Sequence, residues 1–207
     1  MIRKNPCKSY LRIKIFILLL LGNISISSQL LSKESLDTCK VFKTIESAKK
    51  NPKAVYILDL SKRKPHSIPK EITLFENLQV LKLSKNKISE IDSSISFPLF
   101  LQEINLSRNK LKLIPIKVFS MKNLKRLILN QNMITNIPDE IIELQNLVYL
   151  DMWSNNLSGV TNNIKFLTKL ETLDLRVIMF SNKEKDRIKS LLPNTKVHFS
   201  NSCNCGY

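Results

Sequence analysis

Histidine is the side chain that most often carries acid–base catalysis near neutral pH. The 207-residue chain contains only two, His66 and His198. The sequence shows no Ser-His-Asp order, no cluster with metal-ligand spacing and no glycine-rich loop that could hold a phosphate. It therefore predicts a protein that is not an enzyme and that carries neither a metal nor a cofactor.

The cysteines are the other chemically reactive residues: Cys7, Cys39, Cys203 and Cys205. The last two form a CxC pair, which could hold zinc only if at least two further ligands came from elsewhere. We therefore do not predict a zinc site. The pair could equally be free, closed into a strained ring or joined to another molecule.

Residues 1–28 have the composition of a secretory signal peptide. Residues 1–14 carry five cations and no acid, residues 15–21 are an apolar run, and the small residues SISS follow at 25–28. The alternative is a membrane anchor, but so short a run cannot cross about 30 Å of hydrocarbon as a stable helix. The sequence thus predicts export to the medium, the periplasm or the cell surface, with cleavage near residues 27–29.

The chain is strongly basic, with 33 lysines and arginines against 17 acids and a formal net charge of +16. Removal of the five cations of the leader would leave 28 cations against 17 acids, a charge of +11. A balance of this kind favours anionic partners, so the position of the remaining cations decides what they could bind.

The strongest pattern is a gapless repeat of 23 residues. Six units begin at Val55, Leu78, Leu101, Leu124, Leu147 and Leu170. Apolar residues recur at positions 1, 4, 6, 11, 14, 18 and 21, and positions 4 and 6 alternate with polar positions in the manner of a short strand with one buried face. Ile-Pro at positions 14–15 of three units ends regular pairing, so the return path should be irregular or 3₁₀.

Position 9 of four units is asparagine: Asn86, Asn109, Asn132 and Asn155. An asparagine amide can turn inward and satisfy backbone groups that a turning chain would otherwise leave unpaired in the core. We predict that these four residues form a structural ladder.

The pattern LxxLxLxxNxLxxIPxxIxxLxx resembles the leucine-rich repeat family over about residues 55–180. The resemblance implies an α/β fold, a curved horseshoe-shaped solenoid in which each unit adds one strand to a concave parallel sheet. The segments ESAKKNPKAVYILDLS and KEKDRIKSLLPNTKVHF are similar to the ends of small bacterial proteins of this family, notably secreted ones of spirochaetes. A binding module that faces a host is what this resemblance implies.

No unit can bury its apolar face alone, so both ends of the repeat array need caps. Residues 29–54 should form a helical N-terminal cap that is stopped at Asn51-Pro52. One face of its helix should carry Val41, Phe42, Ile45 and Ala48.

Residues 181–207 should form the C-terminal cap and a cysteine-containing tail. Ser181 and Glu184 have capping-box spacing and should open a helix, and Lys196 should begin one more edge strand. The helix should turn inward Ile188, Leu191 and Leu192.

The solenoid architecture also determines how far apart the two ends of the repeat array lie. With strands about 4.8 Å apart, six units separate the two ends by roughly 25–30 Å. A disulfide needs Cα atoms within about 7 Å, so Cys39 cannot pair with Cys203 or Cys205 inside one molecule. His66 and His198, which lie in the first unit and the terminal strand, cannot share a site.

Once the core takes the apolar positions, positions 3, 5 and 7 should form the exposed face of the sheet, and positions 8 and 10 its rim. The rim of the first three units is basic: Lys62, Lys64, Lys85, Lys87, Arg108 and Lys110. Lys82 adds a cation at position 5. Like charges about 5 Å apart are unfavourable, and a linear polyanion such as a sulfated glycosaminoglycan, an acidic protein face or anionic lipid headgroups would relieve them.

The other interpretation of this basic rim is that its lysines only keep the solenoid soluble. Nucleic acid is not favoured as its ligand, because no aromatic residues interleave the cations to stack on bases and the chain is predicted to be exported.

The face of units 4–6 has a different character. It carries Arg126, Tyr149, Trp153 and Arg176, residue types that dominate the energy of protein interfaces. Trp153 either stands exposed or folds down on its neighbours. The sequence thus predicts an exported, non-enzymatic module that binds a protein or a polyanionic glycan. The alternative is an envelope structural or assembly protein with a resident bacterial partner. Oligomeric state is not predicted.

Overall fold

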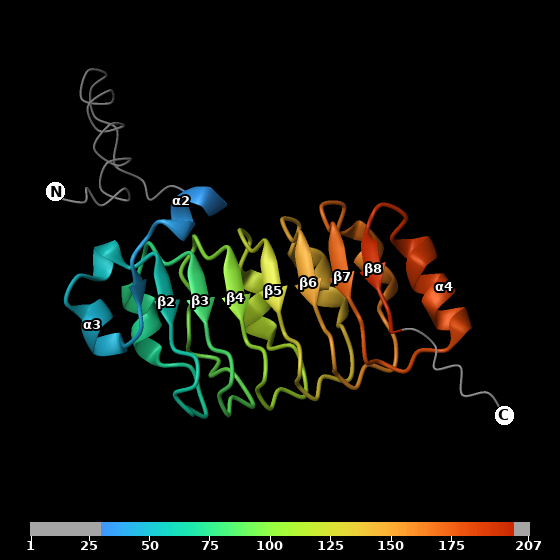
Figure 1. Ribbon diagram of the computed structural model, residues 1–207, viewed down its shortest axis with the longest axis horizontal. Helices are drawn as coiled ribbons and strands as arrows, with labels where there is room; N and C mark the ends of the chain where they lie inside the picture. The colour runs from blue at the N-terminus through green and yellow to red at the C-terminus, as the bar shows by residue number, and fades with distance from the viewer. Residues whose placement is uncertain (1–29, 201–207) are drawn as a thin grey trace, which may run out of the picture.

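A computed structural model describes residues 30–200 (Figure 1). The predicted signal peptide, Cys7, Cys203 and Cys205 lie outside the described residues. Within them, eight strands form one open sheet in sequence order, and every neighbouring pair is parallel. The strands are β1 (Val41–Phe42), β2 (Ile57–Asp59), β3 (Val80–Lys82), β4 (Glu103–Asn105), β5 (Arg126–Ile128), β6 (Tyr149–Asp151), β7 (Thr172–Asp174) and β8 (Lys196–His198).

The register confirms the repeat of 23 residues. From β2 to β7, position 3 of each unit pairs with position 3 of the next, as in Ile57 with Val80 and Glu103 with Arg126. Every equivalent residue therefore stands in one row across the sheet. The solenoid predicted from the spacing is confirmed.

The return paths are 3₁₀ helices, as the Ile-Pro pairs indicate. Pro69, Pro115 and Pro138 immediately precede η2 (Lys70–Leu74), η3 (Ile116–Ser120) and η4 (Asp139–Glu143). Unit 5 has η5 (Asn162–Phe166), and η1 (Pro52–Ala54) leads into the first unit. Unit 2 has Ile91-Asp92 in place of Ile-Pro, and its described return path contains no 3₁₀ helix.

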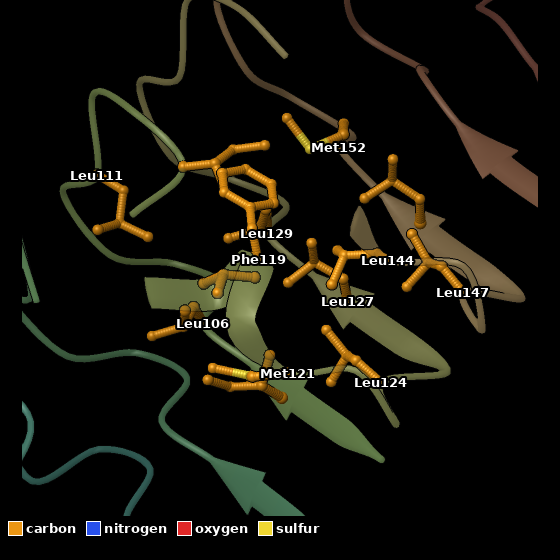
Figure 2. Close-up of a cluster of buried hydrophobic side chains, with 14 of the residues drawn as sticks. Leu106, Leu111, Phe119, Met121, Leu124, Leu127, Leu129, Leu144, Leu147 and Met152 are labelled. Atoms are coloured by element: carbon orange, nitrogen blue, oxygen red, sulfur yellow. The ribbon is translucent and has the colours of Figure 1, made fainter. Parts of the chain in front are cut away.

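The leucines of successive units stack into one continuous core. Figure 2 shows part of it, where Leu106, Leu127 and Leu147 belong to three successive units and join one apolar cluster. The middle residue of each repeat strand is leucine or isoleucine and is fully buried, as in Leu81 and Ile104. No unit buries its apolar side chains alone, so the stability of each depends on its neighbours.

The asparagine ladder predicted from position 9 is present. Asn132 donates from Nδ2 to the carbonyls of Leu106 (3.0 Å) and Leu129 (2.8 Å), and its Oδ1 accepts the Leu111 N–H at 3.1 Å. Asn109 and Asn155 repeat this arrangement. Asn86 donates in the same way, but its Oδ1 accepts the N–H groups of Arg63 and Lys64. Each of the four thus ties its own unit to the one before it. The four amides satisfy backbone groups inside the turning chain.

The N-terminal cap differs from the expectation of one helical face. It contains two short helices, α2 (Lys33–Asp37) and α3 (Ile45–Lys49), but the residues between them form β1. Val41, which we placed on the helix, is 41% exposed, whereas Phe42 and Ala48 join the core. Pairing of β1 with β2 satisfies the first sheet edge, and this tertiary contact prevails over the helical pattern.

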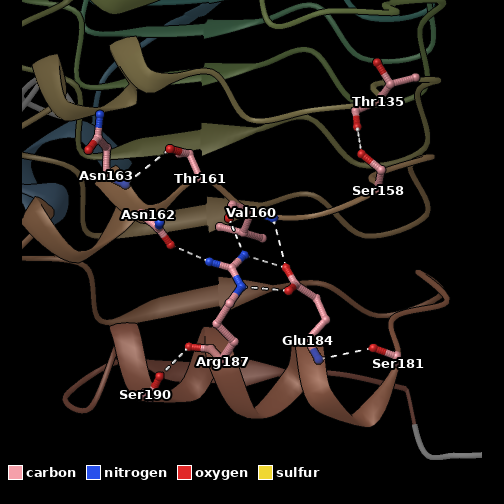
Figure 3. A network of polar contacts seen from close by, with 10 residues as sticks. All are labelled: Thr135, Ser158, Val160, Thr161, Asn162, Asn163, Ser181, Glu184, Arg187 and Ser190. Carbon is pink, nitrogen blue, oxygen red and sulfur yellow. Dashed lines mark hydrogen bonds and ion pairs between the residues drawn. The ribbon is translucent and has the colours of Figure 1, made fainter.

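The C-terminal cap follows the prediction. Helix α4 (Asn182–Leu191) begins where the Ser181 Oγ accepts the Glu184 N–H at 3.2 Å. Ile188 and Leu192 are buried, Leu191 packs against the same core, and β8 pairs with β7. The Glu184 carboxylate does not complete a capping box; it bonds Arg187 and the Val160 N–H instead (Figure 3).

None of the helices in the part of the chain that the structure describes has the length and apolar character needed to cross a membrane.

Candidate binding surface

The structure brings Arg126 and Tyr149 together on neighbouring strands of the sheet. The Arg126 Nε donates to the Glu103 Oε2 at 3.1 Å, and its guanidinium carbon lies 4.1 Å from the centre of the Tyr149 ring. All three are position-3 residues of β4, β5 and β6 and are half-buried. The arginine is thus held between a carboxylate and an aromatic face, which fixes the direction of its remaining donors.

Two aspartates organise the next rows. The Asp151 Oδ2 accepts the Asn130 amide at 2.5 Å, and its Oδ1 accepts the Trp153 N–H at 3.1 Å. The Asp174 carboxylate binds the Arg176 guanidinium, with Nη2 and Oδ2 2.6 Å apart, and accepts the Arg176 N–H at 3.1 Å. Both carboxylates are buried and stand opposite each other in the register of β6 and β7.

The surroundings of these groups shift their pKa values in different directions. Burial raises the pKa of Asp151 above its ordinary value, against the opposing effect of its hydrogen bonds. Burial would also raise the pKa of Asp174, but the hydrogen bonds from Arg176 prevail and the pKa is lowered. Burial, with the nearby charges of Asp151 and Asp174, raises the pKa of Tyr149, so its phenol remains a donor at neutral pH.

Trp153 is half-buried, which lies between the two alternatives that the sequence leaves open. Its carbonyl accepts the Gln131 N–H at 2.8 Å, and the neighbouring Ser154 N–H donates to the Arg176 carbonyl at 2.9 Å. The backbone around Trp153 is therefore hydrogen-bonded to Gln131 of unit 4 and to Arg176 of unit 6. The residue is partly open to solvent. Arg176 is exposed.

The basic rim is present as a row of exposed side chains, namely Lys62, Lys64, Lys85, Lys87, Arg108 and Lys110. None of the six forms an ion pair with a carboxylate of the described residues. Lys82, on the face itself, is half-buried. The rim cations thus have no partner of opposite charge within residues 30–200.

The rim also has an unusual backbone. Position 8 is left-handed in all six units, with φ between 54° and 61°, although its residues are Lys62, Lys85, Arg108, Gln131, Ser154 and Val177. Lys64 is left-handed as well, with φ of 64°. The left-handed backbone of position 8 therefore continues into units 4–6, although its residues there carry no positive charge.

The sequence did not predict that part of the sheet face is covered. Residues 30–39, which include α2 and which we call the strap, pack against Ile57 and Val80. These two residues are only 7% and 8% exposed, so the expectation of an exposed position 3 was wrong for units 1 and 2. Positions 5 and 7 of these units are half-buried. Figure 1 shows α2 beside the ends of β2 and β3.

Two glutamines hold the strap. The Gln79 Oε1 accepts the Leu31 N–H at 2.8 Å, and the Gln102 Nε2 donates to the Leu31 carbonyl at 2.9 Å. Both are position-2 residues, and a signal was present there: the equivalent residues Lys125 and Glu171 are charged and exposed. Val148 of unit 5 is also uncharged, so position 2 alone is not diagnostic; only units 1 and 2 combine an uncharged position 2 with an aliphatic position 3, Ile57 and Val80.

In residues 30–200, no three His, Cys, Asp or Glu side chains are grouped so that they could hold a metal ion. His66 lies in unit 1 and His198 in β8, at opposite ends of the repeat array.

A family model described as leucine rich repeat matches residues 100–157. A leucine-rich repeat protein of Leptospira interrogans is 33% identical over 70% of this chain and 36% of its own, with a TM-score of 0.61. InlP of Listeria monocytogenes is 27% identical over 69% of this chain and 38% of its own, with a TM-score of 0.57.

The plant peptide hormone receptor RGFR1, solved in complex with RGF2, is similar in fold alone. It is 21% identical over 82% of this chain and 29% of its own, with a TM-score of 0.58. The chain spans little more than a third of the length of these structures at most. No curated protein matches it. The in-register 23-residue units, the parallel sheet and these likenesses together show that the chain is a leucine-rich repeat protein resembling those of spirochaetes.

Proposed function

We propose that the chain is an exported binding module that engages a partner protein through the sheet face of units 4–6. The leucine-rich repeat fold suggests protein binding, since its sheet presents an extended surface on a rigid scaffold. One observation carries the choice of surface: Arg126, Tyr149, Trp153 and Arg176 lie on adjacent coils, and all four are at least partly open to solvent.

The electrostatics of this face favour binding, because its cations are held in place before a partner arrives. Arg126 is fixed by Glu103 and Tyr149, and Arg176 by Asp174. A side chain that is already oriented loses less conformational entropy on binding than a free one. Tryptophan, tyrosine and arginine are the residue types enriched among the few residues that carry most of the binding energy at interface centres.

The test compares Trp153→Ala with Phe166→Ala, an exposed aromatic residue on the return path of unit 5. Full-length wild type and both variants are used to capture proteins from a host extract and from the envelope of the producing cell. We expect Trp153→Ala to lose the captured partner and Phe166→Ala to retain it. Equal capture by the two variants, with folding confirmed by circular dichroism, would place the interface elsewhere.

The same experiment separates the proposal from the second candidate, an envelope protein with a resident bacterial partner. Capture that depends on Trp153 and comes from the host extract supports a host-facing role. Capture only from the producing cell supports the envelope role. Export is supported by the basic, apolar and small-residue segments of the first 28 residues. Recovery of the protein solely from the cytoplasm on fractionation would exclude it.

A second ligand class is favoured by the basic rim, whose six exposed cations have no carboxylate partner in the described residues. We infer that a sulfated glycosaminoglycan could lie along the row. Heparin is the probe, and the variant carries Lys62→Glu, Lys85→Glu and Arg108→Glu.

The matched control reverses three exposed lysines away from the rim, Lys112, Lys165 and Lys183, so that both variants have the same net charge. We expect the rim variant to elute from heparin at lower salt than the control, because it lacks the row of adjacent charges. Identical elution would support the view that the lysines serve only solubility.

A further inference from the structure

The strap is held by groups that recognise a peptide backbone rather than a particular side chain. Gln79 takes the N–H of Leu31 and Gln102 takes its carbonyl, while the two amides bond each other at 2.7 Å. Gln79 is fully buried and Gln102 is 5% exposed. Any extended peptide offers the same N–H and C=O, so this pair is suited to bind main chain in general.

The strap also makes apolar contacts with the sheet face. Leu36 and Cys39 form a small cluster with Ile57 and Val80, and this cluster is separate from the continuous core of the solenoid. The side chains of Leu31 and Tyr56 border it. The apolar side chains of Leu31, Leu36 and Cys39 thus add to the backbone clamp in holding the strap.

The strap should detach more easily than any repeat unit. Its helix α2 has five residues, fewer than a helix needs to be stable alone. Opening would leave the pairing of β1 with β2 intact, because that pairing begins at Val41, after the strap ends. Segments with few buried contacts open locally, at a lower free energy than the global unfolding of the chain.

The surface beneath the strap is continuous with the proposed interface. Ile57, Val80, Glu103, Arg126 and Tyr149 are successive residues of one row in the register of β2 to β6. A partner bound at the last three residues would meet the strap at its next contact along the row.

We propose that the sheet face of units 1–3 is a docking site for an extended peptide of a partner protein, with the strap as its resident occupant. The incoming peptide supplies one backbone N–H and C=O to Gln79 and Gln102 and an apolar side chain to Ile57 and Val80. The identity of the ligand as a protein rests on the proposed function; the site and its opening do not.

The opening is tested by hydrogen exchange on the full chain. We expect Gln102→Ala to speed exchange of the strap amides about tenfold or more, with those of β5 unchanged. The matched control is Gln145→Ala, whose exposed side chain bonds only a local carbonyl. Strap amides that exchange together with those of β5, in wild type and variant alike, would show that the strap is an integral part of the fold and would contradict the proposal.

The site is tested with a synthetic peptide of residues 30–39 in which Cys39 is replaced by serine. Leu36→Asp weakens the strap without altering the surface beneath it, and Leu30→Asp changes an exposed leucine of the same segment. We expect the peptide to bind Leu36→Asp about tenfold or more tightly than wild type or Leu30→Asp, because the site is open. Val80→Asp introduced into the Leu36→Asp chain should abolish this binding.

Three outcomes would overturn the proposal. First, the Leu36→Asp chain could bind no peptide although its strap amides exchange freely. Second, the β5 amides of this variant could lose their protection from hydrogen exchange, which would show that the chain cannot fold without the strap. Wild type could instead dimerise as its strap opens, which would identify the strap of a second copy as the occupant. Loss of Trp153-dependent capture with normal peptide binding would contradict the proposed function alone.

Discussion

At the scale of single residues, the aspartate and asparagine side chains at position 5 accept hydrogen bonds from their own backbone. Asp59 accepts the Ser61 N–H at 3.0 Å, and Asn105, Asp151 and Asp174 accept the N–H two residues on in the same way. The side chain fixes the turn from the strand into the rim. These side chains therefore have a structural role in the turn. Asp151 and Asp174 differ in the other groups that surround them.

Asp151→Asn and Asp174→Asn should change stability in opposite directions at pH 7. The native pKa of Asp151 is raised by burial, so its ionisation costs stability as pH rises from about 4 through the native pKa. Asp151→Asn should raise the melting temperature at pH 7, and the gain should vanish at lower pH, where the carboxyl is protonated in both states. Asparagine can keep the turn, as Asn105 does.

For Asp174 the sign is reversed. Burial raises its pKa less than the Arg176 hydrogen bonds lower it, so ionisation stabilises the native state above the ordinary pKa. Asp174→Asn should lower the melting temperature at pH 7, and the loss should disappear as pH falls through the lowered native pKa. Thermal melts of both variants between about pH 3 and pH 8, a range that extends to both sides of the ordinary pKa of aspartic acid, check the pair. Shifts of the same sign at pH 7 would contradict the assignment.

Val177→Asn should stabilise the protein by about 1 kcal/mol, since a β-branched residue in the left-handed region is strained and asparagine tolerates it. Val177 has φ of 59° and is 56% exposed, so little burial is lost. Met179→Asn, exposed and without positive φ, is the control for the change in polarity. Urea unfolding measures both. An equal effect of the two substitutions would show that strain at Val177 is negligible.

The residue scale also shows what periodicity can and cannot predict. The inward turn of Asn132 was predictable, because a buried backbone needs donors and acceptors at that point of the coil. The left-handed backbone of position 8 was not, because lysine, arginine and valine give no sign of it. The position-8 N–H of units 1–5 donates to a carbonyl of the next unit, as Lys62 does to Ser84, and the Val177 N–H donates to the Ser200 Oγ. The repeat geometry, rather than the residue type, therefore accompanies this conformation.

At the scale of elements, the two caps differ in how much their sequences reveal. Helix α4 has an N-cap serine and an apolar face, and both were predicted correctly. At the other end, β1 is two residues long and belongs to no repeat, so no pattern indicates it. The strap was missed for a similar reason, because its partners Gln79 and Gln102 lie outside the apolar positions of the repeat.

Arg187 connects α4 to unit 5 and should be its main polar attachment. Its Nη2 donates to the Val160 carbonyl at 2.6 Å, its Nη1 to the Asn162 Oδ1 at 2.5 Å, and its Nε to Glu184 (Figure 3). Arg187→Ala should cost about 1–3 kcal/mol, as expected for charge-assisted bonds to a partly buried backbone.

Lys183→Ala is the matched control, a basic residue of the same helix that is exposed. Urea unfolding gives the free energies, and hydrogen exchange at Val160 locates the effect, because its N–H donates to the Glu184 carboxylate. A loss no larger than that of Lys183→Ala would mean that apolar packing of Ile188 and Leu192 alone holds the helix.

At the scale of the whole molecule, the residues that stabilise the stacked units differ from the residues that are available to bind a partner. The core and the left-handed rim run along the whole array, and the asparagine ladder along units 2–5. The surface, in contrast, changes from basic in units 1–3 to aromatic and mixed in charge in units 4–6. The strap covers the face only in the basic half. Binding can therefore vary from unit to unit without a change of fold, which is why the repeat predicts the fold and leaves the ligand open.

The linear arrangement of the units also predicts how far along the sheet a destabilising substitution acts. Each strand pairs only with its neighbours in sequence, so a unit far from a substitution loses no contact. Ile188→Ala, in the fully buried face of α4, should cost about 3 kcal/mol and speed exchange most in β8 and β7, less in β6 and least in β2. Leu81→Ala, a fully buried residue of unit 2, should give the opposite gradient. Uniform acceleration along the sheet in both variants would show that the array unfolds as one cooperative unit.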